Sequence, residues 1–220
     1  MRAAPKTGKL LGESRGLVFD FDGTLVDSNA IKRRGFEACF SEFSDRREEI
    51  LAYCRGHNHT PRWDKFRHVY EKILRLPYTP EIEQRLSRRF EQVTTLQITQ
   101  APEIPFAEKF LRRARRTHWT GLLSATPSPI LNEILKKRGW KDLFQRVQGA
   151  PVRKSAWLRE LKEQMGWKPE ELLFFGDTPE DVQAARDAEC GFIAVGDAPA
   201  SGGSFTTVTS YEPLLKELEA

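Results

Sequence analysis

The stretch LVFDFDGTLVDS, residues 17–28, decides how the rest of this chain is read. An apolar run leads into two aspartates, Asp20 and Asp22, and then into Gly23 and Thr24. Alternate residues of a strand point to the same side, so the two carboxylates face one way. A buried carboxylate without a partner or a metal ion is costly. The stretch therefore predicts a buried strand that ends in a site for chemistry.

The composition of the 220 residues favours a soluble protein with a core, since 39% are hydrophobic and 30% are charged. No apolar run is long enough to cross a membrane, and residues 1–14 lack the apolar core of a secretion signal. Cys39, Cys54 and Cys190 show no paired spacing, which favours reduced thiols and a cytoplasmic protein.

The charge balance suits an anionic substrate, because 35 basic residues against 31 acidic ones give a net charge of +4. The densest basic run, residues 112–116, is interpreted as the solvated C-terminal end of a helix, where cations suit the dipole. We therefore expect no nucleic-acid partner and no membrane partner. The sequence predicts no particular oligomeric state.

The order of apolar patterns predicts an α/β fold with a helical insertion. Strands are expected at 17–20, 119–124, 144–149, 172–175, 191–195 and 205–209, and helices at 29–43, 45–54, 61–75, 80–97, 104–116, 127–138, 153–165, 179–189 and 212–219. Alternating strands and helices are typical of a doubly wound parallel sheet. We predict a catalytic core of residues 1–28 and 104–220, with an all-helical cap domain at 29–103 inserted after the first strand.

Polar side chains follow three of the expected strands. Asp20 and Asp22 follow the first, Ser124 ends the second, and Asp177 follows the strand at 172–175. Ligands of open α/β sheets bind at the C-terminal ends of strands, so these groups are expected in one crevice. An all-oxygen acidic cluster needs a hard cation, and Mg²⁺ is the expected one.

Each motif also has a purely structural interpretation. Asp-Gly is a common turn pair, and Asp181 falls at the third position of a helix that Thr178 would cap. Ser124 either belongs to an ordinary strand-to-helix turn, with Thr126 as the N-cap, or binds phosphate together with backbone N–H groups. Lys154 is either a solvated lysine or an anion ligand at the start of a helix, where a cation opposes the dipole.

Taken together, these motifs resemble the signatures of the haloacid dehalogenase superfamily over roughly 15–28 and 104–198. The motifs that carry the resemblance are Asp20-x-Asp22-Gly23-Thr24, Ser124, Lys154 and Asp177 with Asp181. The insertion after the first motif is similar to the helical cap of that family. An acid at position 22 argues against dehalogenation, because a dehalogenase has no leaving alcohol to protonate.

The resemblance implies a magnesium-dependent phosphatase that acts on a small phosphorylated metabolite, similar to phosphoglycolate or a sugar phosphate. It implies that Asp20 attacks phosphorus and that Asp22 acts as general acid and base. Metal binding is then expected at Asp20, Asp22 (through its backbone carbonyl), Asp177 and Asp181, and phosphate binding at Thr24, Ser124, Ala125 and Lys154. A phosphomutase would use the same motifs, and a catalytically silent scaffold would have lost one, which this chain has not.

The cap is expected to choose the substrate. The polar stretch at 54–66 is the segment expected to face the site, and Arg62 is the predicted substrate contact. His57 and His59 are interpreted as loop residues, because two histidines alone do not make a metal site. The aromatic residues at 63, 66 and 70 have helical spacing and are interpreted as the core of the cap.

Overall fold

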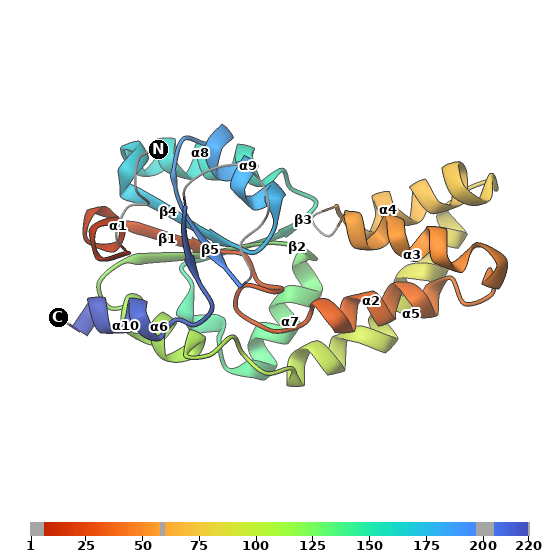
Figure 1. The fold of residues 1–220 in the computed structure, drawn as a ribbon, viewed down its shortest axis with the longest axis horizontal. Coiled ribbons are helices and arrows are strands. Elements are labelled where there is room, and N and C mark those ends of the chain that lie inside the picture. The colour runs from red at the N-terminus through yellow and green to blue at the C-terminus, as the bar shows by residue number, and fades with distance from the viewer. Residues whose placement is uncertain (1–6, 58–59, 197–204, 220) are drawn as a thin grey trace. The chain divides into compact units, whose positions relative to one another are not determined.

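The computed structural model describes residues 7–57, 60–196 and 205–219 of the chain (Figure 1). It divides the chain into two compact units. One unit comprises Met1–Asp27 together with Pro102–Ala220, and the other is Ser28–Ala101. We describe the first as the α/β unit and the second as the helical unit. In the described part of the chain, no helix combines the length and apolar character that a membrane span requires.

The α/β unit is built on a parallel sheet of six strands. These are β1 (Gly16–Phe19), β2 (Trp119–Pro127), β3 (Arg146–Ala150), β4 (Leu172–Gly176), β5 (Gly191–Val195) and β6 (Thr206–Val208). Their order is β3-β2-β1-β4-β5-β6, and every neighbouring pair is parallel. The strand order reverses at β1, which is where open α/β sheets bind ligands. The predicted doubly wound α/β fold is confirmed.

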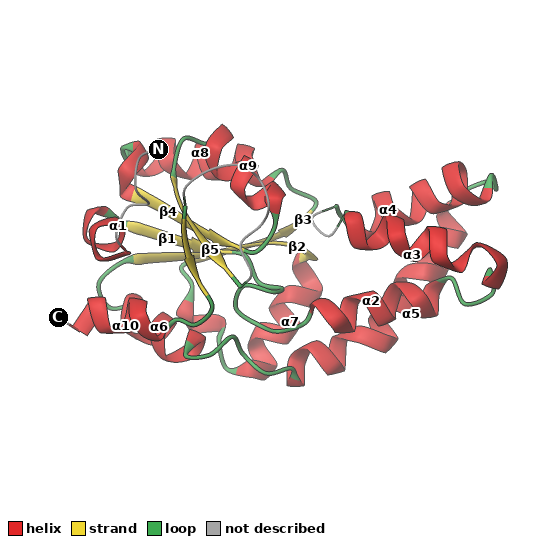
Figure 2. Ribbon diagram, viewed as in Figure 1, coloured by secondary structure: helices red, strands yellow, loops and turns green. Residues whose placement is uncertain are grey.

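Helices cover both faces of this sheet. They are α1 (Thr7–Glu13), α6 (Ala107–Ala114), α7 (Ser128–Arg138), α8 (Lys154–Met165), α9 (Pro179–Asp187) and α10 (Glu212–Glu219). Two short 3₁₀ turns, Lys141–Leu143 and Pro169–Glu171, precede β3 and β4. Figure 2 shows α8 and α9 on one side of the sheet and α6, α7 and α10 on the other. A covered sheet of this kind explains why the predicted strands are continuously apolar.

The strand β1 lies at the centre of the core, and its apolar residues Leu17, Val18 and Phe19 are fully buried. On one face, Val18 packs in a cluster with Trp157 of α8 and other apolar residues. On the other face, the ring of Phe19 stacks on that of Phe175, with centroids 4.6 Å apart. Burying each such side chain contributes roughly 1.5–3 kcal/mol, so β1 has a fixed position from which to present the residues that follow it.

The helical unit contains α2 (Asn29–Cys39), α3 (Arg47–Gly56), α4 (Arg62–His68) and α5 (Pro80–Gln100). A 3₁₀ turn, Ser44–Arg46, precedes α3, and a π-helical segment, Val69–Leu74, continues α4. The core of the helical unit is aromatic. Phe36, Phe66 and Phe90 are buried, and their ring centroids lie 4.8 to 6.3 Å apart. Phe66 and Tyr70 belong to this core, as the aromatic spacing predicts, whereas Trp63 is half-buried and is not part of it.

Candidate active site

The site lies where β1, β2 and β4 end. In the sheet register Phe19 pairs with Leu122 on one side and with Phe175 on the other. The residues that follow these positions therefore come to one edge of the sheet. This is the physical reason why Asp20, Ser124 and Asp177 approach each other although more than a hundred residues separate the first from the other two.

The loop after β1 is a tight turn that turns both aspartates inward. The backbone N–H of Asp20 donates to the carbonyl of Phe175 at 2.8 Å, which continues the sheet by one residue. Gly23 has φ +80°, a conformation that favours glycine, and its N–H donates to the Val26 carbonyl at 2.8 Å. As a result Asp20 and Asp22 are each only 6% exposed.

Three carboxylates meet at this edge of the sheet. Asp20, Asp177 and Asp181 can each place one carboxylate oxygen so that the three atoms lie within 4.8 Å of one another. Lys154 lies among them: its Nζ is 3.0 Å from Oδ1 of Asp20 and 2.7 Å from Oδ1 of Asp181. The structure thus brings together the acids of the first and last motifs and the lysine between them.

The charges of the cluster perturb each other strongly. Burial raises the pKa of Asp20; the Lys154 ammonium lowers it, while the carboxylates of Asp181, Asp177 and Asp22 raise it further, to about 7 in total. Burial alone would lower the pKa of Lys154, but the carboxylates of Asp181 and Asp20 raise it above its ordinary value. Lys154 is therefore a permanent cation, whereas Asp20 bears an unusually costly negative charge.

The donor set fits a metal ion. It consists of carboxylate oxygens, which are the ligands of hard divalent cations, and one lysine does not neutralise three acids. Burial is the main cause of the raised pKa of Asp20, and the negative charge of Asp181, Asp177 and Asp22 adds to it. A divalent cation held by Asp20, Asp177 and Asp181 would remove that repulsion.

Asp181 caps α9, as one sequence interpretation predicts, and it also belongs to the acidic cluster. Its Oδ2 accepts hydrogen bonds from the hydroxyl of Thr178 at 2.7 Å and from the Thr178 N–H at 3.2 Å, which completes a capping box at the start of α9. Its Oδ1 faces Lys154. Gly176 makes this arrangement possible, because a Cβ at that position would lie 2.4 Å from the Cβ of Asp181.

Thr126 is a site residue that the sequence interpretation missed. The expectation that it caps a helix at 127–138 is wrong: β2 continues to Pro127, α7 begins at Ser128, and no side chain caps it. The Thr126 hydroxyl instead donates to Oδ2 of Asp22 at 3.0 Å, in a buried position. The Ser-x-Thr spacing along a strand, which puts both side chains on one side, could have signalled this.

Ser124 and the neighbouring groups line the same edge. Ser124 is 1% exposed, and its Oγ accepts a hydrogen bond from the Thr126 N–H at 3.1 Å. Ala125 is half-buried between them. The hydroxyl of Thr24 donates to Oδ1 of Asp177 at 3.3 Å, which ties the loop after β1 to the end of β4.

Arg62 lies in the core of the helical unit and is 9% exposed. Its guanidinium forms an ion pair with Glu91 and lies 5.7 Å from the centroid of the Phe90 ring. Its contact with substrate stays a prediction. His57 is bonded through Nδ1 to the Tyr53 carbonyl at 2.8 Å, and His59 lies outside the described residues.

The family model of the haloacid dehalogenase-like hydrolases matches residues 15–189. A phosphoglycolate phosphatase of Synechococcus elongatus is 29% identical over 185 residues, which cover 82% of each chain. One from Yersinia pestis is 28% identical over 209 residues, covering 82% of this chain and 80% of the relative.

Solved structures share the fold. CbbY from Rhodobacter sphaeroides in complex with phosphate has a TM-score of 0.70 at 17% identity, covering 94% of this chain and 100% of that one. A haloacid dehalogenase-like family hydrolase from Streptococcus pneumoniae has a TM-score of 0.66 at 16% identity, covering 92% and 96%. The resemblance drawn from the motifs is confirmed, and the chain belongs to the haloacid dehalogenase-like hydrolases.

Proposed function

We propose that the chain is a magnesium-dependent phosphatase that hydrolyses a small phosphorylated metabolite through an aspartyl-phosphate intermediate. The observation that carries the proposal is the cluster of Asp20, Asp177 and Asp181 around Lys154. It supplies a nucleophilic carboxylate, a set of ligands for a hard cation and a fixed positive charge. These are the parts that phosphoryl transfer requires.

The ion would be held by Asp20, Asp177, Asp181 and the backbone carbonyl of Asp22. Mg²⁺ suits a site of oxygen donors, and it would offset the repulsion between the attacking carboxylate and the phosphate. The side chain of Asp22 does not belong to the three-carboxylate cluster, which leaves it available to transfer protons.

In the proposed reaction a carboxylate oxygen of Asp20 attacks phosphorus, and the bond between phosphorus and the ester oxygen breaks. Asp22 gives its proton to the departing alkoxide, so that the alcohol leaves neutral. Asp22 then takes a proton from a water molecule, whose oxygen attacks the phosphorus of the aspartyl-phosphate. The acyl phosphate bond breaks, inorganic phosphate leaves, and Asp20 is a free carboxylate again.

The remaining residues hold the phosphoryl group and the proton carrier. Lys154 and the hydroxyl of Ser124 would bind phosphoryl oxygens, with the backbone N–H groups of Thr24 and Ala125. Preorganised donors of this kind stabilise the charge of the transition state without reorganisation. The hydrogen bond from Thr126 orients the carboxylate of Asp22.

A phosphoglycolate- or sugar-phosphate-like compound is the proposed substrate. The curated relatives are phosphoglycolate phosphatases, and their similarity covers about four-fifths of this chain. We propose a cytoplasmic location, because Cys39, Cys54 and Cys190 are free thiols that an oxidising compartment would expose to pairing.

The test is the release of inorganic phosphate from 2-phosphoglycolate by the purified protein with Mg²⁺. Asp20→Asn is expected to abolish release, and Asp22→Asn to retain Mg²⁺ binding but lose most of the rate. Asp142→Asn, an exposed acid in the same unit, is the matched control and should behave as wild type. Equal activity of wild type and Asp20→Asn would refute the mechanism. Transfer of phosphate to a second sugar hydroxyl without net release would indicate a phosphomutase instead.

A further inference from the structure

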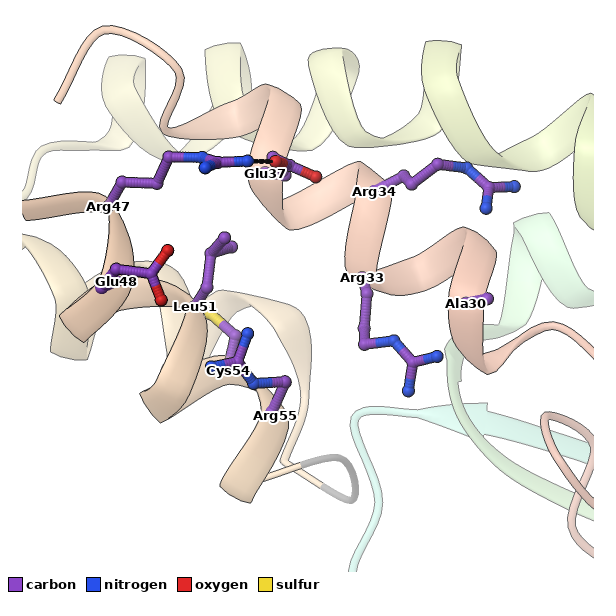
Figure 3. Close-up of a pocket in the computed structure, with 9 residues that line it drawn as sticks. All are labelled: Ala30, Arg33, Arg34, Glu37, Arg47, Glu48, Leu51, Cys54 and Arg55. Atoms are coloured by element: carbon purple, nitrogen blue, oxygen red, sulfur yellow. Dashed lines mark hydrogen bonds and ion pairs between the residues drawn. The ribbon is translucent and has the colours of Figure 1, made fainter. Parts of the chain in front are cut away.

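A pocket of about 420 Å³ lies in the helical unit between α2 and α3 (Figure 3). That volume is within the range of sites for small molecules. Every residue that lines it belongs to the helical unit: Ala30, Arg33, Arg34, Glu37, Arg47, Glu48, Leu51, Cys54 and Arg55. None of them takes part in the cluster of aspartates described above.

The lining carries four arginines against two glutamates, an excess of positive charge. Two of the arginines have protein partners. Arg47 forms an ion pair with Glu37, and Arg34 donates to Oε1 of Gln97 at 2.9 Å. Figure 3 shows the side chain of Arg34 directed away from the other arginines. The ion pair of Arg47 with Glu37 is internally neutral, and Arg34 is already bonded to Gln97, so two arginines of the lining are left to bind a ligand.

Arg33 of α2 and Arg55 of α3 are those two. Neither forms an ion pair or a side-chain hydrogen bond within the part of the chain that the structure describes. Figure 3 places them on the two walls toward one end of the pocket, and the Arg47–Glu37 pair toward the other end. Two guanidinium groups on separate helices repel each other unless an anion lies between them.

The rest of the pocket favours one negatively charged group at the end where Arg33 and Arg55 lie. Burial raises the pKa of the Cys54 thiol to about 11, so Cys54 is neutral and adds no negative charge. Leu51 beside it offers an apolar surface. Glu48 lies next to Arg47 in Figure 3 and would repel an anion from that end.

We propose that this pocket is a binding site for the phosphate or carboxylate group of a small metabolite, with Arg33 and Arg55 as its ligands. The planar guanidinium group matches both oxyanions and binds them with two parallel hydrogen bonds. The anion is either the second charged group of the substrate or a separate effector. Binding here does not depend on the proposed phosphatase activity, because it uses none of the catalytic residues.

The first experiment titrates inorganic phosphate into the ¹⁵N-labelled chain without metal and follows backbone amide signals. Saturable shifts at Leu51 and Arg55 report the pocket, while those at Asp20 and Thr24 report the catalytic site separately. The double variant Arg33→Gln/Arg55→Gln is expected to weaken binding at the pocket by about tenfold or more, since each charge-assisted hydrogen bond contributes at least that factor.

The matched control is Arg115→Gln/Arg116→Gln, which removes the same charge at two exposed positions of the α/β unit. It should bind phosphate at the pocket as wild type does. Absence of saturable shifts at Leu51 and Arg55 over a millimolar range overturns the proposal. Equal affinity of wild type and Arg33→Gln/Arg55→Gln also overturns it, whatever happens at the Asp20 and Thr24 signals.

A second experiment separates the two sources of the anion. If it belongs to the substrate, Arg33→Gln/Arg55→Gln raises KM for 2-phosphoglycolate about tenfold and leaves KM for p-nitrophenyl phosphate, which has no second anion, unchanged. If it is a separate effector, the variant loses phosphate shifts at the pocket while both KM values stay as in wild type. Either result supports the anion site.

Discussion

Asp20→Asn should make the metal-free protein more stable above neutral pH, although it removes the proposed nucleophile. Asp20 is buried, and repulsion from the surrounding carboxylates together with desolvation outweighs its attraction to Lys154. Asparagine has nearly the same shape and bears no charge. The variant therefore keeps the packing and loses the cost of ionisation.

The magnitude follows from the pKa. The pKa of the Asp20 carboxyl is raised from its ordinary value of 3.8 to about 7, and each pKa unit corresponds to about 1.4 kcal/mol. The ionised form therefore costs the folded protein up to about 4 kcal/mol. Because the folded state holds this proton more tightly, the contribution of Asp20 to wild-type stability is fully present below pH 4 and is lost as the pH rises through 7. The variant should gain nothing near pH 4 and most above pH 7.

The assay is urea unfolding in EDTA, followed by circular dichroism, for both proteins between pH 4 and 8. Asp142→Asn is the control, since Asp142 is exposed and its removal should change the free energy of unfolding little at any pH. Lower stability of Asp20→Asn than of wild type at pH 8 would refute the electrostatic reasoning. So would a gain of the same size at pH 4 and pH 8.

Three further substitutions test the other parts of the site. Lys154→Met leaves three acids without their cation. The free energy of unfolding at pH 8, measured by urea unfolding, should therefore fall by about 3–5 kcal/mol. The rate of phosphate release should fall by about 100-fold. Asp177→Asn should raise the Mg²⁺ concentration for half-maximal activity at least about tenfold in a metal titration. Thr126→Val should lower kcat about tenfold, because the carboxylate of Asp22 loses its hydrogen bond, whereas Thr126→Ser keeps the hydroxyl and should not. Equal kcat values of the two variants would contradict the proposed orienting role of Thr126.

The sheet and the acidic residues at its edge were predictable because each depends on local sequence. A continuous apolar strand followed by Asp20 needs no distant information, and neither does the capping box of Thr178 and Asp181. Parallel pairing then brings strand ends together by geometry alone. The separation of a helical block from an α/β pattern likewise rests on periodicity.

Features that depend on distant partners were not predictable. Tyr211 is fully buried, and its hydroxyl donates to the carbonyl of Thr24 at 3.1 Å across 187 positions of sequence. The predicted helix at 104–116 begins later, at Ala107, because Phe106 has φ +67°. α1 was not predicted at all; it is a short helix that packs against α10.

At two helix starts the residue that local helix rules favour differs from the one that the charged cluster requires. One of these conflicts helped the sequence interpretation, and the other misled it. At α8 a lysine stands in the first position without a side-chain cap, which opposes the helix dipole. The oxygens of Asp20 and Asp181 offset that cost, so the local misfit correctly signalled the charged cluster. At α7 the Thr126-Pro127 pair fits a helix start so well that it concealed a hydroxyl aimed at Asp22. A residue that obeys a local rule can therefore hide a contact with a distant carboxylate, whereas one that breaks a rule reveals such a contact.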